Sequence, residues 1–271
     1  MLTVHNAPPD RRLRPFIRSY VQRESHLKGT ELVEPVVARL GAVLEFQFAD
    51  PYEVPIYGID KPNPSAPITL IGPITWRRAR ILIRGHVEAL AVLFQPLGFH
   101  ALFGVPVSPL ADEGTEGQGL IGPSISALNE RLGNTANFQE RTQLLDIFFL
   151  NRLTQVRPLG SVGMALERLI APGRQVAVSD LARQAGISPR QLERISLQYA
   201  GMPPQTMMRI ARFQRALRLK VEDKLSWTEV AHATDYHDQM HMIRDFRAFA
   251  GNSPVRAFEQ FKPDHLSRLA L

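Results

Sequence analysis

Two short motifs in the sequence have residue types suited to catalysis or cofactor binding. His237 and His241 stand four residues apart, the spacing at which two imidazoles on one helix bind zinc, and residues 117–122 fit the Gly-x-Gly-x-x-Gly pattern of dinucleotide sites. His237, however, precedes the expected cap of its helix, and no predicted strand leads into residue 117. Because the chain has no cysteine, thiolate nucleophiles and cysteine metal sites are excluded as well. We therefore expect no catalytic residue, no metal and no cofactor, and hence no enzyme.

The arginines are the other group with chemical potential, because a guanidinium pairs with a phosphate. Residues 1–157 contain 16 Lys and Arg against 15 Asp and Glu, whereas residues 158–271 contain 16 against 11. Most of the formal net charge of +6 therefore lies in the smaller C-terminal part. This asymmetry favours contact between that part and a polyanion such as nucleic acid.

A helical hairpin at about residues 178–200 would position some of these arginines. Ala182 is small where a second helix would cross, and Gly186 can adopt the left-handed conformation of a tight turn. Ile187 then points into the shared core, and Ser188 supplies the hydroxyl that caps the second helix. The pattern is typical of a helix-turn-helix unit, although a single copy also fits an ordinary hairpin in a helical bundle.

A second copy at about residues 226–249 favours the helix-turn-helix interpretation. Ser226 and Glu229 have the spacing of a capping box at the start of its first helix. Asp235 stands where the first copy has Gly186, and aspartate is among the few residues that tolerate the left-handed region. The repeat therefore predicts two similar turns, each followed by a helix that can enter a DNA groove.

Residues 203–222, between the two copies, are predicted to form one helix of roughly 30 Å. One face is apolar, with Met207, Ile210, Phe213, Leu217 and Val221, and four arginines lie off it: Arg209, Arg212, Arg215 and Arg218. A helix of this length separates the two copies by close to one turn of B-DNA, about 34 Å. We expect Arg209, together with Arg247 in the second copy, to contact phosphates.

These residues resemble the AraC/XylS family of transcription regulators, over about residues 161–261. The most specific stretch is 236–247, followed by Gly251 and Pro254. The resemblance implies a DNA-binding protein whose module consists of two helix-turn-helix units joined by a long helix. A cytoplasmic location is expected because the absence of cysteine fits a reducing compartment. A fainter similarity to the family's sensor domains lies at 93–99 and 103–106.

The resemblance also implies which side chains read bases, when the family's positions are carried over one by one. They are Arg190, Glu193 and Arg194 in the first unit and Gln239, Met240 and Arg244 in the second. Arginine can bond guanine through two hydrogen bonds, glutamine can do the same with adenine, and glutamate can accept a hydrogen bond from cytosine. Ser196 and Met242 stand where the family leads us to expect Phe. We expect the core beneath both helices to pack less rigidly, without loss of DNA binding.

The N-terminal half has a different periodicity, with short apolar blocks separated by Pro and Gly. The blocks predict strands at 36–38, 43–48, 68–71, 81–83 and 90–94. Their spacing is typical of a small β-barrel or sandwich, a cupin-like fold among them. Helices are expected near 97–103, 124–132 and 137–152. The last is too apolar to be exposed, so it packs either on the barrel or on a second chain.

The predicted protein therefore has two domains: residues 1–157, an α+β sensor or dimerisation domain, and residues 158–271, an all-α DNA-binding domain that begins near Gly160. The expected function is ligand-responsive, sequence-specific regulation of transcription, with double-stranded DNA and a small-molecule effector as partners. RNA polymerase and a second copy stay open as partners. Two alternatives also stay open: a DNA-binding regulator without a ligand, and a barrel enzyme with a helical oligomerisation domain. No stretch approaches the roughly 18 apolar residues of a membrane span, so no membrane partner is expected.

Overall fold

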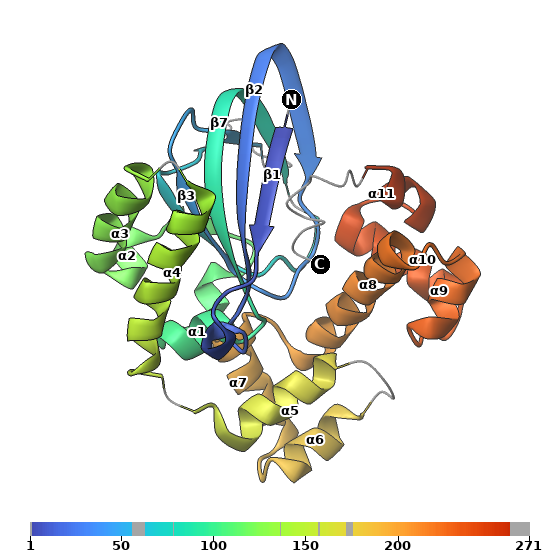
Figure 1. Ribbon diagram of the computed structural model, residues 1–271. Coiled ribbons are helices and arrows are strands. Elements are labelled where there is room, and N and C mark those ends of the chain that lie inside the picture. The colour runs from blue at the N-terminus through green and yellow to red at the C-terminus, as the bar shows by residue number, and fades with distance from the viewer. Residues whose placement is uncertain are drawn as a thin grey trace.

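The computed structural model describes residues 2–55, 63–77, 79–135, 137–156, 158–171 and 176–260. An antiparallel sheet with helices against it is followed by a group of helices (Figure 1). This arrangement confirms the predicted fold class, an α+β N-terminal part and an all-α C-terminal part. Three features of the sequence lie outside the described residues: Gly58, a glycine between the apolar blocks at 43–48 and 68–71; the predicted domain boundary at residue 157; and the chain beyond Gln260.

The described strands of the N-terminal part form one eight-stranded antiparallel sheet. They are β1 (Leu2–Ala7), β2 (Ile17–Pro35), β3 (Val43–Gln47), β4 (Glu53–Val54), β5 (Asn63–Pro64), β6 (Ile68–Ile71), β7 (Arg80–Phe94) and β8 (Gly114–Glu116). The main order is β1-β2-β7-β3-β6-β8, and β4 pairs with both β5 and β7. The two longest strands, β2 and β7, lie side by side (Figure 1) and connect the other strands.

One strand prediction is wrong, and two other predicted strands are joined into one. Residues 81–83 and 90–94 belong to a single strand, because Gly85 adopts a left-handed φ of 67° within β7 instead of ending it. This glycine pairs with Leu27, next to the register shift in β2 between Leu27 and Leu32. Residues 36–38 are not a strand of the sheet. The backbone N–H of Ala38 instead donates to the carbonyl of Phe249 in the C-terminal part.

In the part of the chain that the structure describes, four α-helices accompany the sheet: α1 (Gly98–Phe103), α2 (Gln118–Ile121), α3 (Ser124–Gly133) and α4 (Phe138–Leu153). Helix α4 is the apolar helix for which the sequence left two partners open, and it packs on the sheet (Figure 1). Leu145 and Phe149 are fully buried there, and the Phe149 ring lies 5.9 Å from the ring of Phe94 in β7. Ile147, on the other side of α4, is half exposed.

The glycine pattern at 117–122 directly follows β8 and contains α2, so the expectation that no strand precedes it is wrong. Strand β8 has only three residues at the edge of an antiparallel sheet, and α2 has four. A dinucleotide site uses a parallel strand followed by a long helix, so the context still does not fit. A Cβ atom at Gly117 would lie 2.8 Å from Cγ2 of Ile68, which gives this glycine a packing role.

Seven helices make up the described C-terminal part. They are α5 (Gly160–Ile170), α6 (Val178–Gln184), α7 (Pro189–Ala200), α8 (Pro204–Glu222), α9 (Trp227–Ala233), α10 (Gln239–Ala250) and α11 (Pro254–Gln260). Helix α8 runs between the α6–α7 pair and the α9–α10 pair (Figure 1). Met207, Ile210, Phe213 and Leu217 on α8 are fully buried and hold both pairs in one core. In the described part of the chain, no helix is both long and apolar enough to cross a bilayer.

Candidate nucleic-acid interface

The two helix-turn-helix units have the same backbone turn. Gly186 and Asp235 both adopt the left-handed conformation, with φ of 73° and 56°, as the sequence predicts. In the first unit the N–H of Ile187 donates to the carbonyl of Ala182 at 3.0 Å. In the second unit the N–H of Tyr236 donates to the carbonyl of Ala231 at 3.2 Å. Two different residue types therefore produce one turn geometry.

Side-chain caps fix where α7, α9 and α10 begin, whereas α6 begins after Ala177 without one. The Ser188 hydroxyl accepts from the backbone N–H of Gln191 at 3.2 Å, and the Asp238 carboxylate accepts from that of His241 at 2.7 Å. This hydrogen bond lowers the pKa of Asp238, so the α10 cap is charged at neutral pH. The capping box at the start of α9 has both of its bonds, 2.7 and 3.3 Å.

Helices α7 and α10 correspond residue by residue at an offset of 50 positions, the separation of the caps Ser188 and Asp238. Both helices end at a left-handed glycine, Gly201 and Gly251. The correspondence pairs Arg190 with Met240, Leu192 with Met242, Arg194 with Arg244, Ser196 with Phe246, and Leu197 with Arg247. Arg194 and Arg244 are therefore equivalent side chains on two equivalent helices.

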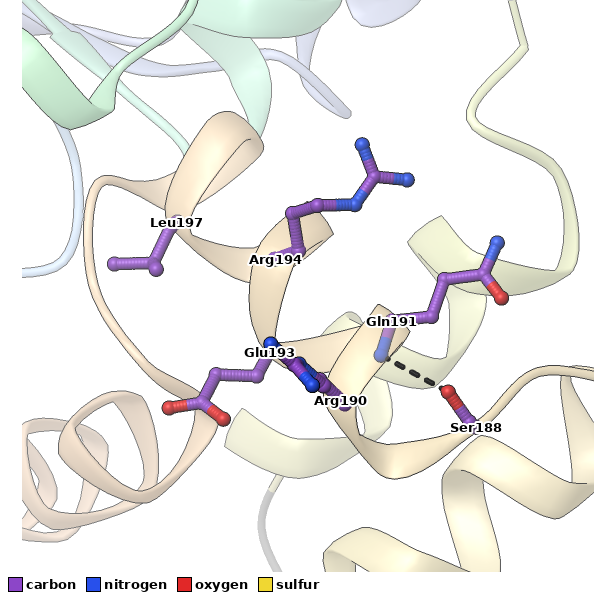
Figure 2. Close-up of a pocket in the computed structure, with 6 residues that line it drawn as sticks. All are labelled: Ser188, Arg190, Gln191, Glu193, Arg194 and Leu197. Carbon is purple, nitrogen blue, oxygen red and sulfur yellow. Dashed lines mark hydrogen bonds between the residues drawn. The ribbon is translucent and has the colours of Figure 1, made fainter.

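The reading positions of α7 are exposed and gather on one surface. Arg190, Glu193 and Arg194 line a shallow groove of about 580 Å³ together with Ser188, Gln191 and Leu197. In Figure 2 the side chains of Glu193 and Arg194 extend outward from the helix. Among the described residues, neither Arg190 nor Arg194 forms an ion pair within the protein.

The reading positions of α10 are exposed as well, and two of them form long hydrogen bonds within the described residues. Gln239 Nε2 donates to the Thr228 hydroxyl at 3.4 Å, and Arg244 Nε donates to the carbonyl of Met240 at the same distance. The Met240 side chain is 57% exposed, so an apolar group lies beside the two polar side chains on this helix. These three side chains are therefore accessible to a ligand.

Arg209 and Arg247, the expected phosphate contacts, have different surroundings. Arg209 donates to Asp245 Oδ1 from Nε at 3.0 Å and from Nη2 at 2.8 Å, and its guanidinium lies 5.0 Å from the ring centre of Phe249. It therefore joins α8 to α10, while its side chain stays about half exposed. Arg247 is exposed on α10. The phosphate contacts of both arginines remain predictions.

The residues that replace the expected phenylalanines are both buried. The Ser196 hydroxyl donates to the carbonyl of Met202 at 2.7 Å, so its polar atom is satisfied within the core. Met242 lies on the buried face of α10, which also carries Phe246, and the ring centres of Phe246 and Phe213 lie 4.9 Å apart. Whether this core is less rigid than one with phenylalanines stays a prediction.

A buried polar cluster in the sheet is a second candidate site, and the sequence did not reveal it. Arg23 Nη1 donates to Glu34 at 2.7 Å, Arg23 Nη2 lies 4.0 Å from Glu45 Oε2, and the Tyr52 hydroxyl donates to Glu45 Oε1. Burial raises the pKa of Tyr52, so its hydroxyl remains protonated. Within the described chain, Arg23 Nη2, Ser25 Oγ and Glu45 Oε2 are buried without a hydrogen-bond partner. Charged residues in a strand resemble a solvated face, which is why this cluster was missed.

Comparison with known families and structures agrees with this geometry. Residues 181–260 match a family model described as a helix-turn-helix domain, and residues 5–116 match a domain of unknown function, DUF6597. ToxT from Vibrio cholerae has the same fold at 8% identity, with a TM-score of 0.51 over 97% of this chain and 98% of that one. The structure of ToxT with bound unsaturated fatty acid, from strain SCE256, shares 10% identity with this chain and has a TM-score of 0.50. The match covers 97% of this chain and 95% of that one. No curated protein matches the sequence.

Paired helix-turn-helix units on a connecting helix, with exposed arginines at equivalent positions, define a DNA-binding regulator of transcription. Residues 181–260 form a helix-turn-helix domain of the AraC type.

Proposed function

We propose that this protein is a cytoplasmic, ligand-responsive regulator in which residues 1–157 sense a small molecule and residues 158–271 bind a DNA site of two major-groove segments. The observation that carries the DNA-binding half is the residue-by-residue equivalence of α7 and α10, with Arg194 and Arg244 exposed at matching positions. Helix α8 has 19 residues and thus a length of roughly 28 Å. This length suits two helices in successive major grooves, about 34 Å apart.

The two helices would read different bases. On α7, Arg190 and Arg194 bond guanine and Glu193 accepts from cytosine. On α10, Gln239 bonds adenine, Arg244 bonds guanine, and Met240 contacts a thymine methyl group. Each well-formed pair contributes about 1 to 3 kcal/mol of discrimination between bases. The first segment of the site would therefore be richer in G·C pairs than the second.

Selection of DNA from a random library by the full chain tests this proposal. The expected result is a motif of two segments with guanine in both. Arg194→Lys keeps the charge but loses the two-bond geometry, so it should relax the guanine preference in the first segment and retain salt-dependent affinity. The control is Arg131→Ala, an exposed arginine on α3. Recovery of no motif, or of the same motif with Arg194→Lys, would contradict the assignment.

The polar cluster supports the sensing half of the proposal. Arg23 Nη2 and Glu45 Oε2 are buried, lack hydrogen-bond partners in the described structure and lie 4.0 Å apart. A ligand hydroxyl could accept from Arg23 and donate to Glu45, whereas a ligand carbonyl could accept from Arg23 alone. The fatty-acid-bound ToxT structure has this fold, which supports a small-molecule effector without identifying it. Thermal-shift screening of the full chain with small polar metabolites tests this half, with Glu45→Gln as the variant that should abolish a shift. A screen without any hit would favour the alternative of a regulator that has no ligand.

A further inference from the structure

The N-terminal part holds both DNA-reading helices at their C-terminal ends. The backbone N–H of Val107 donates to the carbonyl of Gln198 in α7 at 2.8 Å. The backbone N–H of Arg77 donates to the carbonyl of Ala248 in α10 at 3.2 Å. Gln198 and Ala248 are 50 positions apart, the same offset that relates the two helices, so the N-terminal part bonds to equivalent carbonyls.

Helix α10 has two further bonds of this kind. Ala38 N–H donates to the carbonyl of Phe249 at 3.0 Å, and Arg77 Nη1 donates to the carbonyl of Ala250 at 3.1 Å. The last carbonyls of a helix lack partners within it and carry the negative end of its dipole. A guanidinium at this end therefore satisfies a carbonyl and also complements the dipole.

The glycines that end the two helices permit this close approach. A Cβ atom at Gly201 would lie 2.9 Å from Pro73 Cγ and 3.1 Å from the carbonyl oxygen of Val107. A Cβ atom at Gly251 would lie 2.4 Å from Arg77 Cδ. Both positions therefore need glycine for contact with the N-terminal part as well as for their left-handed backbone.

Two segments of the N-terminal part form a unit at this contact, and we name residues 36–40 and 72–77 the docking segments. Arg39 and Ile74 exchange backbone hydrogen bonds of 2.8 and 3.0 Å between them, and Arg39 Nη2 donates to the carbonyl of Gly72 at 3.1 Å. The Asp112 carboxylate accepts from the N–H of Thr75 at 2.7 Å and from its hydroxyl at 2.5 Å. Arg77 therefore extends from a segment that is fixed on both sides.

The docking segments leave the reading faces open. They contact residues 248–251 at the end of α10, whereas Gln239, Met240 and Arg244 lie in its first half and are exposed. Arg190 and Arg194 of α7 are exposed in the same way, away from the contact at Gln198. The contact can therefore hold the helices without covering the side chains that would read DNA.

We propose that Arg77, with the docking segments, is a positioning element for DNA reading: it fixes α10 relative to α7 and thereby sets the spacing between the two DNA segments that the protein accepts. This inference rests on the proposed function. It also gives the N-terminal domain a direct mechanical connection to the second recognition helix.

The test measures affinity of the full chain for the selected site and for versions with two base pairs added or removed between the segments. Arg77→Ala removes the bond to Ala250 and keeps the backbone bond to Ala248, so the fold should persist. We expect the preference for the native spacing to fall about tenfold, the value of one charge-assisted hydrogen bond, while binding to the first segment alone stays unchanged. Arg77→Lys should retain most of the preference. Arg80→Ala, at an exposed arginine in β7, is the matched control.

Other outcomes separate the two proposals. If the wild-type chain prefers the native spacing and Arg77→Ala keeps the same preference, the positioning role alone is overturned. An equal loss of affinity at all spacings would also overturn it, because that is the effect of simple destabilisation. Tighter binding by Arg77→Ala would show that the contact blocks DNA instead. If the wild-type chain selects no sequence at all, the proposed function itself fails and the positioning role fails with it.

Discussion

At the scale of single residues, the two turns show how different side chains satisfy one backbone requirement. Gly186 adopts a left-handed φ without steric cost, whereas Asp235 adopts it at some cost. The Asp235 carboxylate also forms an ion pair with Arg215, with Oδ2 3.8 Å from Nη1. The turn at 235 was predictable because its requirement is local. Ser196 was harder, because nothing near it in the sequence indicates that its hydroxyl would bond to the carbonyl of Met202.

Gly186→Ala provides a test of this backbone requirement. No atom lies within 4 Å of the position that the new Cβ would occupy, so the cost comes from the left-handed backbone alone. We expect a loss of about 1 to 2 kcal/mol in the free energy of unfolding of the C-terminal part, measured by chemical denaturation. Gly119→Ala, equally open but without a positive φ, should change stability by much less. Equal effects at both positions would contradict the explanation.

At the scale of elements, predictability depended on how local the pattern was. Helix α8 and its buried apolar face follow from a period of 3.6 residues. Strands β2 and β7 were missed or divided because their pairing is long-range and because buried Arg23 and Glu34 have the sequence signature of exposed residues. The contact of the docking segments with α10 was not predictable, since its acceptors are backbone carbonyls that carry no sequence signal.

The two candidate phosphate contacts can be separated experimentally. Arg209 is bonded to the buried Asp245, so Arg209→Ala should destabilise the C-terminal part by about 1 kcal/mol, and Arg209→Ala with Asp245→Ala should recover part of the loss. Arg247 is exposed, so Arg247→Ala should leave stability unchanged. It should make the slope of log affinity for DNA against log salt concentration less steep, by about the amount that one phosphate contact contributes. Denaturation and titration of binding against salt measure the two effects. A changed salt dependence with Arg209→Ala would place this arginine on the DNA as well.

At the scale of the whole molecule, the two parts are joined by more than a linker. His100 of α1 is buried, stacks on Tyr199 of α7 with ring centres 4.2 Å apart, and bonds through Nδ1 to the carbonyl of Val105. Burial lowers the pKa of His100, so the folded protein favours the neutral ring. The contact between the N-terminal part and α7 is therefore sensitive to the protonation of His100.

This linkage has a definite sign. Because the folded-state pKa of His100 is below that of the unfolded chain, about 6.5, stability is greatest above that pH and decreases as the pH falls below it. We expect His100→Phe, which keeps an aromatic ring against Tyr199, to reduce this decrease in unfolding measurements between pH 8 and 5.5. The exposed His232→Phe serves as the control. An unchanged pH profile in His100→Phe would assign the decrease to other groups.

The measurement that tests the account most directly is a hydroxyl-radical footprint of the full chain on its selected site, with Arg194→Ala and Arg244→Ala compared separately. Equivalent helices that read successive major grooves should protect two segments centred about 10 base pairs apart. Arg194→Ala should lose protection of one segment only, and Arg244→Ala should lose the other. A single protected segment, or loss of the same segment in both variants, would contradict the claim that α7 and α10 are two readers of one DNA site.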